Sequence, residues 1–235
     1  MILVIRPEPG CAATLAAGRH AGLALELEGC PLSEIRPLAW EPPPAESFDA
    51  LLLGSANALR HAGPALANYQ GKPSLAVGAT TAEAAREFGL AIIATGSGGL
   101  QVLLDALAAS GRLPPRLLRI TGAEHVALQP PPGSSIETQI AYESAPLLLP
   151  PALAARLAQG GGVLLHSAAA ARRLAAECRR LAVPRAQVAL AALGPRIAAA
   201  AGEGWRRVLV AAEPSEAALL ALAAHLCHGR DEANV

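Results

Sequence analysis

Two serine-containing segments combine residue types that suit anion binding. Gly54-Ser55-Ala56-Asn57 and His166-Ser167-Ala168-Ala169 each follow an apolar run and precede a helical pattern. A serine at such a junction commonly caps the helix by accepting a hydrogen bond from a first-turn N–H. The exposed N–H groups and the positive end of the helix also attract carboxylate or phosphate. Both interpretations, a structural cap and an anion site, stay open for these serines.

Two glycine-containing segments occupy comparable places farther along each half of the chain. Gly78-Ala79-Thr80-Thr81 and Gly194-Pro195-Arg196-Ile197 also join an apolar run to a helical pattern. A glycine there lets a ligand approach the backbone closely, although it also serves simply to turn the chain. Neither half contains GxGxxG or GxxxxGK[ST], so the Rossmann dinucleotide fingerprint and the P-loop are absent.

Tyr142 is one of only two tyrosines and lies in a segment with β-branched neighbours. A phenol can donate a proton or a hydrogen bond to a leaving oxygen. The alternative is a half-buried strand aromatic without a chemical role. No Ser-His-Asp set can be assembled, because His166 adjoins Ser167 with no spaced acid to orient it. The motifs therefore indicate anion binding but name no reaction.

Cysteine and histidine spacing argues against a metal site. The cysteines, at positions 11, 30, 178 and 227, contain no CxxC pair, and the histidines form no HExxH or similar cluster. We expect buried, reduced thiols in a cytoplasmic protein and no structural metal. Arg, Gly or Pro interrupts every apolar run before 18 residues, and no basic n-region precedes the first run, so neither a membrane span nor a secretory leader is expected.

Composition excludes several other classes. The 235 residues carry 19 Lys+Arg and 19 Asp+Glu, a balance that disfavours a general nucleic-acid binder. The hydrophobic fraction of 52% is far too high for intrinsic disorder, and two residues each of Trp, Tyr and Phe are too few for a base-stacking platform. A monomer is the default expectation, because no heptad stripe is present.

Short apolar runs alternate with Ala/Leu-rich helical patterns along the whole chain. The runs are continuous rather than alternating, which suits strands buried on both faces of a parallel sheet. Strands are predicted at 2–5, 50–53, 75–77, 91–94, 117–120, 163–165, 188–193 and 208–211, and helices at 11–21, 56–67, 79–88, 99–109, 152–159, 168–181, 196–203 and 215–227. This alternation predicts an α/β architecture with helices on both sheet faces.

An internal repeat divides the chain. LLLGSANALR (51–60) matches VLLHSAAAAR (163–172) at six of ten positions, an offset of 112, and later segments match at an offset of 116. The first copy is followed by the strand pattern RLLRITG (116–122), whereas the second has no such strand after it. The N-terminal run ILVIRP (2–7) has the same apolar-then-Arg form and is the candidate for the missing strand.

A discontinuous domain follows from that assignment. We predict one lobe from 1–33 and 146–235, an inserted lobe at 40–135, and linker strands at 34–39 and 136–145. The two linkers run in opposite directions between the lobes, so they can pair as a two-stranded ladder that acts as a hinge.

The order of these segments resembles the uroporphyrinogen-III synthase family over nearly the whole chain, about 1–226. The segments that carry the resemblance are ILVIRP (2–7), PLSEIRPL (31–38), FDALLLGSAN (48–57), AVGATTAEA (76–84), AYES (141–144) and ALGP (192–195). The resemblance implies two flavodoxin-like parallel-sheet lobes joined by a two-stranded β-ladder hinge. It also implies a lyase of porphyrin and haem biosynthesis that closes hydroxymethylbilane, a linear tetrapyrrole with eight carboxylates, between the lobes.

The resemblance also assigns residues. Tyr142 matches the linker tyrosine that helps to expel the ring-A hydroxyl. The expected substrate-binding residues are Arg6, Ser55, Ala56, Asn57, Gly78, Thr81, His166, Ser167, Ala168, Gly194, Pro195 and Arg196. No cofactor or metal is implied, and hydroxymethylbilane synthase is a candidate transient partner. One alternative is a non-catalytic hinge protein on the same scaffold that binds a tetrapyrrole or another polycarboxylate. A second alternative is a sugar-nucleotide transferase, but the absence of glycine-rich nucleotide-binding motifs argues against it.

Overall fold

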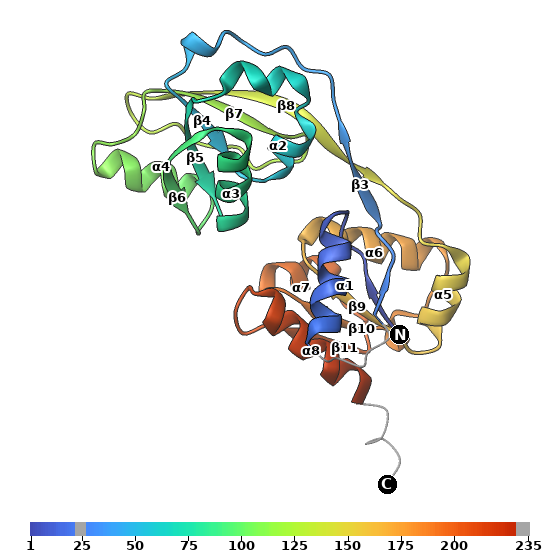
Figure 1. Ribbon diagram of the computed structural model, residues 1–235. Coiled ribbons are helices and arrows are strands. Elements are labelled where there is room, and N and C mark those ends of the chain that lie inside the picture. Colours follow the sequence, from blue (N-terminus) through green and yellow to red (C-terminus); the bar gives the residue numbers. More distant parts are fainter. Residues whose placement is uncertain (22–26, 229–235) are drawn as a thin grey trace. The chain divides into compact units, whose positions relative to one another are not determined.

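The computed structural model describes residues 1–21 and 27–228. The chain divides into two compact units: unit 1 comprises Met1–Glu34 with Ala145–Val235, and unit 2 comprises Ile35–Ser144. Each unit has its own sheet covered by helices on both faces (Figure 1); the sheet of unit 1 is parallel, and that of unit 2 is parallel except for its edge strand β3. The predicted α/β class with two parallel sheets is confirmed.

Unit 1 contains a five-stranded parallel sheet. Its strands are β1 (Ile2–Val4), β2 (Leu27–Gly29), β9 (Gly162–Leu165), β10 (Ala189–Ala192) and β11 (Arg207–Val210), in the order β11-β10-β9-β1-β2. Counted along the chain from β1, this is the flavodoxin-like order 2-1-3-4-5, in which the helices after the two central strands diverge to opposite faces.

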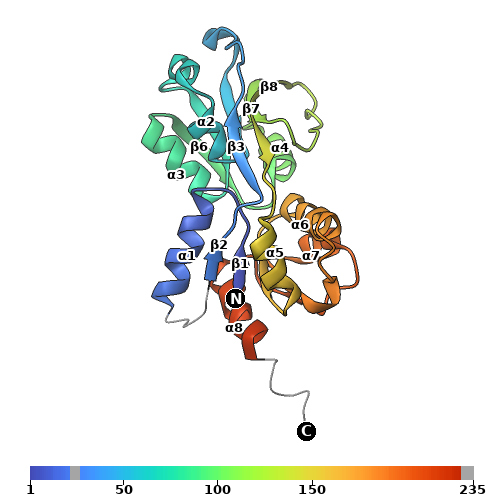
Figure 2. The same cartoon turned by 90° about the vertical axis from the view of Figure 1, so that its right-hand side faces the viewer.

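Helices enclose both faces of the unit 1 sheet. The helices α1 (Gly10–His20) and α8 (Glu216–His228) cover one face, and α5 (Pro151–Ala158), α6 (Ala168–Arg180) and α7 (Pro195–Ala201) cover the other, where a short 3₁₀ turn, η3 (Arg185–Gln187), precedes β10. Figure 2 shows α1 and the group of α5, α6 and α7 on opposite sides of β1 and β2. Two separate apolar layers therefore hold the sheet in place.

Unit 2 repeats this arrangement. Its sheet has the order β3-β8-β7-β4-β5-β6, with β3 (Ser33–Pro37), β4 (Ala50–Leu53), β5 (Pro73–Val77), β6 (Ala91–Gly96), β7 (Arg116–Gly122) and β8 (Ser135–Pro146). One face packs against α2 (Asn57–His61), the 3₁₀ helix η2 (Pro64–Tyr69) and α3 (Ala79–Phe88); the other packs against α4 (Leu100–Ala109). A 3₁₀ turn, η1 (Ala45–Ser47), precedes β4.

The register of the two sheets agrees with the sequence repeat. Leu51 of β4 lies between Leu118 of β7 and Ser74 of β5. Val163 of β9 corresponds to Leu51 at the offset of 112, and it lies between Leu3 of β1 and Leu190 of β10. Leu190 in turn corresponds to Ser74 at the offset of 116. The N-terminal strand thus completes the second copy as predicted, and the strand pairing is duplicated residue by residue.

Several expected elements differ from the structure. The predicted helix at 56–67 is interrupted at Gly63, which has a φ of 68°, so α2 ends at His61 and a 3₁₀ segment follows. The strand β2, which has only three residues, was not predicted. The outermost strands β6 and β11 are not buried on both faces, because each has a neighbour on one side only; Ile93 and Val208 are 44% and 40% exposed.

The linker strands form a ladder, as expected, but β8 does more than link. Backbone hydrogen bonds from Leu38 to Ala141 (2.8 Å) and from Leu147 to Leu32 (2.9 Å) show that β3 and β8 run antiparallel. The strand β8 also pairs in parallel with β7 from Ser135 to Tyr142. It is therefore a member of the unit 2 sheet and not only a connection.

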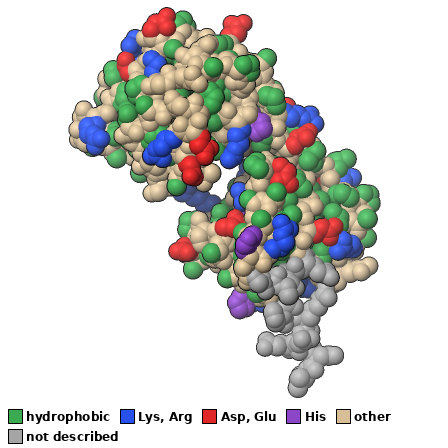
Figure 3. Space-filling model, viewed as in Figure 1, with side chains coloured by type: hydrophobic (Ala, Val, Ile, Leu, Met, Phe, Trp, Pro, Cys, Tyr) green, Lys and Arg blue, Asp and Glu red, His purple; other side chains and the backbone are tan. Residues whose placement is uncertain are grey.

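The surface charges are mixed, and the cysteines whose side chains are described are buried. Acidic and basic side chains are interspersed on the face shown in Figure 3, in line with a formal net charge of zero. Cys11, Cys30 and Cys178 are buried and unpaired, as predicted, whereas the side chain of Cys227 lies outside the described part. Within 1–21 and 27–228, no helix is long and apolar enough to cross a membrane.

Candidate functional site

The carboxyl ends of β1 and β9 meet at the point where the unit 1 strand order reverses. Arg6 follows β1, and His166 follows β9. The chain leaves β1 toward α1 on one face and leaves β9 toward α6 on the other. Ligands of open α/β sheets bind in the crevice that this divergence creates. The structure thus brings together two of the predicted binding residues, Arg6 and His166.

Two residues that sequence reasoning missed join them in one polar cluster. Thr14 of α1 is fully buried, and Glu216 is the first residue of α8. Arg6 Nη1 donates to Thr14 Oγ1 (3.3 Å) and to Glu216 Oε2 (3.2 Å). Thr14 Oγ1 donates to Glu216 Oε1 at 2.7 Å. His166 Nε2 lies 3.4 Å from Thr14 Oγ1 and 3.3 Å from both carboxylate oxygens. We call these four residues the switch-point cluster.

The hydrogen bonds of the switch-point cluster fix the position of one proton. Thr14 gives its hydroxyl proton to Glu216, and an ionised carboxylate only accepts, so His166 Nε2 must carry a proton to bond to either. His166 Nδ1 is buried without a partner among the described residues.

Charge balance in the cluster favours an ionised Glu216. Burial raises the pKa of the Glu216 carboxyl, but hydrogen bonds from His166 and Thr14 and the nearby charges of His166 and Arg6 outweigh that effect, so its net pKa is lowered. The side chains of Arg6 and Glu216 are each 33% exposed, whereas that of His166 is only 6% exposed. The ion pair between Arg6 and Glu216 therefore forms the solvent-facing layer over buried Thr14 and His166.

The other predicted residues of unit 1 lie at helix starts on the same edge of the sheet. Ser167 caps α6 as expected, accepting the N–H of Ala170 at 3.1 Å, and Ala168 begins that helix. Gly194 precedes α7, Pro195 is its first residue, and Arg196 is exposed. The carboxyl edge of the unit 1 sheet therefore presents first-turn N–H groups and an arginine.

Ser55 differs from its counterpart Ser167. The residue that caps α2 is Ala56, which is buried and supplies no side-chain bond. Within the described residues Ser55 Oγ accepts the N–H of Asn57, at 3.2 Å, in a tight local turn, so the structural-cap interpretation does not hold for Ser55. The reason is the short helix α2, which begins two residues after Ser55 instead of one.

Gly78 and Thr81 lie at the start of α3, and the structure separates their roles. Gly78 has a φ of 85°, which favours glycine, and a Cβ placed there would meet no atom within 4 Å. The backbone at Gly78 is therefore open to a ligand. The side chain of Thr81 is buried, and its assignment to substrate binding rests on the resemblance alone and stays a prediction.

Tyr142 lies on β8 beside the end of β7. It pairs with Gly122, and a Cβ on Gly122 would lie 2.6 Å from Tyr142 Cε2, so the ring covers the glycine. The His61 ring lies 6.3 Å from the tyrosine ring, tilted by 47°. Glycine at 122 is thus required for this ring position, and the phenol has an imidazole as a neighbour.

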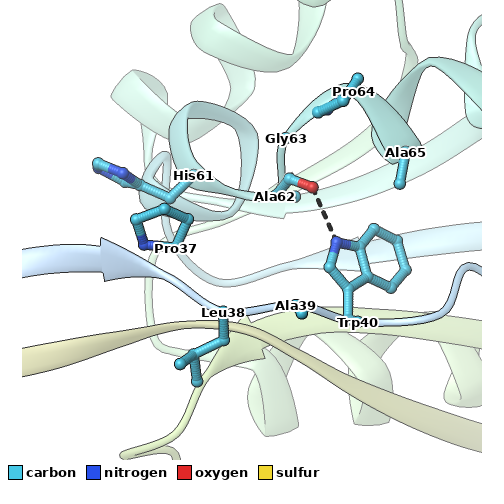
Figure 4. Close-up of a pocket in the computed structure, with 9 residues that line it drawn as sticks. All are labelled: Pro37, Leu38, Ala39, Trp40, His61, Ala62, Gly63, Pro64 and Ala65. Atoms are coloured by element: carbon cyan, nitrogen blue, oxygen red, sulfur yellow. Dashed lines mark hydrogen bonds between the residues drawn. The ribbon is translucent and has the colours of Figure 1, made fainter.

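A pocket of about 360 Å³ adjoins His61 in unit 2. Its walls come from 37–40, after β3, and from 61–65, between α2 and η2. Figure 4 shows the Trp40 indole N–H directed at the Ala62 carbonyl, a hydrogen bond of 2.8 Å. The lining is otherwise mostly apolar, so the pocket suits a hydrophobic or aromatic ring edge better than a carboxylate.

Arg119, in the middle of β7, is a second residue that the sequence reasoning missed. It is buried, donates from Nη1 to the Val126 carbonyl at 2.8 Å, and leaves Nε without a partner among the described residues. Burial lowers the pKa of its guanidinium, an effect that the nearby Tyr142 partly opposes. An arginine in the middle of the otherwise apolar run LLRI (117–120) was a usable signal.

Signals for Thr14 and Glu216 were also present. Thr14 is the only hydroxyl residue in the helical pattern at 11–21. The offset of 116 aligns Glu216 with Leu100. The first residue of this helix is therefore apolar in the first copy of the repeat and acidic in the second, a difference that marks Glu216. No group of three or more His, Cys, Asp or Glu side chains in the described ranges is arranged to hold a metal ion.

Comparison with known proteins decides the family. Residues 23–221 match the family model described as Uroporphyrinogen-III synthase HemD. The chain belongs to the uroporphyrinogen-III synthase family. The match includes His166 and Glu216 but begins after Arg6 and Thr14. The resemblance drawn from the ordered segments is thereby confirmed.

Solved structures agree with this family at the level of the fold. The uroporphyrinogen-III synthetase of Helicobacter pylori superposes with a TM-score of 0.66 at 16% identity, covering 96% of this chain and 98% of that chain. A mutant uroporphyrinogen III synthase from Thermus thermophilus gives a TM-score of 0.52 at 17% identity, covering 96% and 98%. A search of curated proteins found no significant match. The synthase fold is thus kept at very low sequence identity.

Proposed function

We propose that this chain is a uroporphyrinogen-III synthase, a lyase that closes hydroxymethylbilane with loss of water and gives uroporphyrinogen III. The observation that carries the proposal is the family match over 23–221, which includes most of both units. The duplicated register of the two sheets supports it, because it provides two carboxyl edges built on one plan.

The reaction expected of this family rearranges one ring. Loss of the ring-A hydroxyl as water leaves an azafulvene, and the substituted carbon of ring D attacks it to form a spiro-pyrrolenine. That intermediate fragments and recloses with ring D inverted. Because hydroxymethylbilane also cyclises unaided to the uninverted isomer I, the protein must fold the bilane and stabilise developing charge.

Tyr142 is the proposed proton donor or hydrogen-bond partner of the leaving hydroxyl. Its ring is held over Gly122, and His61 is a neighbour. A positioned phenol can assist departure of hydroxide, which is otherwise a poor leaving group. The ordinary alternative, a strand aromatic that only packs, has support from the partial burial of Tyr142 within the unit 2 core.

The carboxylates of the substrate are proposed to bind at the carboxyl edges of the sheets. In unit 1 the residues offered are Arg6, Arg196 and the N–H groups behind Ser167 and Gly194; in unit 2 they are the backbone at Gly78 and the turn at Ser55. Amide groups at helix starts bind anions without adding net charge. This explains how a chain of zero formal net charge can hold a polyanion.

The ladder of β3 and β8 is the proposed hinge. Only these two strands connect the segments 35–144 and 145–235 with 1–34, and they are joined to each other by backbone hydrogen bonds. A two-stranded ladder bends more easily than a covered sheet.

The test is to supply hydroxymethylbilane and resolve the product isomers. A synthase gives mainly isomer III at a rate proportional to the protein concentration. A protein that only binds the bilane or the product leaves isomer I dominant, and that result would remove the proposed activity while keeping the family assignment.

A further inference from the structure

The Arg6 guanidinium uses only one of its three nitrogens for hydrogen bonds within the described ranges. All its hydrogen bonds in the described ranges run through Nη1, to Thr14 and Glu216. Nε and Nη2 have no partner there. This pair of N–H groups is the edge of a guanidinium that binds a carboxylate through two parallel hydrogen bonds.

The surrounding residues hold the guanidinium in this orientation. Glu216 lies on the first turn of α8, whose N-terminus is capped by Ser215 Oγ (3.2 Å from the Ala218 N), so the helix favours its negative charge. Thr14 is fully buried and bonds to both Arg6 and Glu216. The Nε–Nη2 edge lies against Gly10, where a Cβ would overlap Nε, Cζ and Nη2, so this edge can receive a ligand only because residue 10 has no side chain. Three residues on two helices, α1 and α8, therefore restrict one flexible side chain.

We infer that Glu216, together with Thr14, is a positioning residue that holds Arg6 by Nη1 so that its Nε–Nη2 edge receives a carboxylate of the substrate. This inference rests on the proposed function. It assigns to α8 a part in binding although α8 contributes no direct contact to the ligand. His166, buried beneath, supports the carboxylate of Glu216 from the other side through Nε2.

The opposite role for Glu216 is that of a competitor, a carboxylate that occupies Arg6 and must leave before a ligand can bind. The geometry speaks against it. A competing carboxylate would form a bidentate pair with the Nε–Nη2 edge, whereas Glu216 contacts only Nη1 of Arg6. Glu216 is also held by hydrogen bonds to Thr14 and His166. The two roles predict opposite signs for the same substitution.

The experiment compares Glu216→Gln, Arg6→Met and the double variant. Positioning predicts that E216Q raises KM for hydroxymethylbilane about tenfold, the change expected when one charged hydrogen bond is weakened, and leaves kcat nearly unchanged. Because Glu216 acts through Arg6, adding E216Q to R6M should change KM no further. Gly10→Ala, which displaces the guanidinium but keeps every charge, should raise KM as well.

Controls separate binding from folding. Glu203→Gln makes the same charge change at an exposed position of unit 1 outside the switch-point cluster and should leave KM as in the native chain. Thermal melting of each variant identifies loss of fold. Calorimetric titration with uroporphyrin III, a stable octacarboxylate, reports affinity without turnover. E216Q should weaken that binding in the native background and not in R6M.

Two results would overturn the inference. A lower KM or tighter uroporphyrin III binding in E216Q would show that Glu216 is a competitor. An equal loss of affinity from E216Q in the R6M background would show that it does not act through Arg6. Failure of the native chain to form isomer III is a separate result, which removes the synthase activity while the titration still tests the positioning role.

Discussion

Units 1 and 2 share strand order and register but differ where the strand order reverses. In unit 1 His166 follows β9 and bonds to Glu216 of α8. The equivalent pair in unit 2 is Gly54 and Leu100, which are so close that a Cβ on Gly54 would lie 3.0 Å from Leu100 Cδ1. Duplication has kept the backbone of this crevice, whereas its side chains are polar and charged in one copy and apolar in the other.

A second difference lies beside the first. The helix α1 follows β1 in unit 1, but residues 123–134 after β7 form no helix. Val4 of β1 packs in the core beneath α1, and the aligned residue of β7 is the buried Arg119, which bonds to the Val126 carbonyl of that loop. A long side chain with a polar end thus occupies space that a helix fills in the other copy.

The largest expected effect concerns the tyrosines, both of which are in unit 2. Tyr142→Phe should lower turnover by roughly ten- to a hundredfold, because a positioned proton donor is lost, with little change in the melting temperature. The matched control is Tyr69→Phe. Burial raises the pKa of Tyr69 to about 12, and its hydroxyl bonds to the Pro43 carbonyl at 2.6 Å. Tyr69→Phe should lower stability but not turnover; unchanged turnover in Tyr142→Phe would exclude that residue from the chemistry.

Arg119→Ala tests the loop that replaces a helix. It removes a buried, charged hydrogen bond and leaves a cavity, so the free energy of unfolding should fall by about 2–4 kcal/mol in urea denaturation. Arg116→Ala is the control on the same strand: this exposed arginine pairs with Asp49 at the surface and should matter much less. Equal losses for the two variants would contradict the structural role of Arg119.

Thr14→Val tests whether the buried layer of the switch-point cluster stabilises unit 1. Valine keeps the shape but removes the bonds to Arg6 and Glu216, so a loss of about 1–2 kcal/mol in the free energy of unfolding is expected. Thr80→Val, on the exposed first turn of α3 in unit 2, should change stability by less than about 0.5 kcal/mol. A neutral Thr14→Val would mean that the cluster contributes nothing to stability.

The smallest effect is a pH dependence confined to unit 1. The pKa of Glu216 is lowered on folding, so its stabilisation is present in full above the ordinary value of 4.5 and is lost as the pH falls through the folded value. Because Glu216 is one-third exposed, the difference in unfolding free energy between the native chain and E216Q should be below about 1 kcal/mol at pH 7. Urea titrations should show the difference shrink as the pH falls below 4.5; a difference that grows in acid would have the wrong sign.

Much of the fold was predictable because its signals are local. Continuous apolar runs such as 50–53 and 163–165 gave the buried strands, and the repeat placed the N-terminal strand beside β9. The errors have local causes too. The strand β2 is too short to show a period, Gly63 breaks a helical pattern of good composition, and the edge strand β6 keeps apolar residues on its exposed side.

The site was predictable in part. The strand-to-helix junction argument singled out His166, and the structure places it beside Arg6 because parallel strands bring their carboxyl ends together; that either residue binds substrate stays a prediction. Their partners Thr14 and Glu216 lie in the middle and at the start of helices that pack against the sheet from elsewhere in the chain. Such a contact depends on helix rotation, which an Ala-rich helix does not reveal. The burial of Thr81 was missed for the same reason.

The hydrogen bond between Leu147 and Leu32 has a practical consequence for dissecting the molecule. The N–H and carbonyl that it joins are 2.9 Å apart and flank the junctions at 34/35 and 144/145. Excising 35–144 therefore leaves two antiparallel chain ends near enough for a tight two-residue turn to rejoin them. A chain shortened in this way keeps all five strands of the unit 1 sheet in their original order.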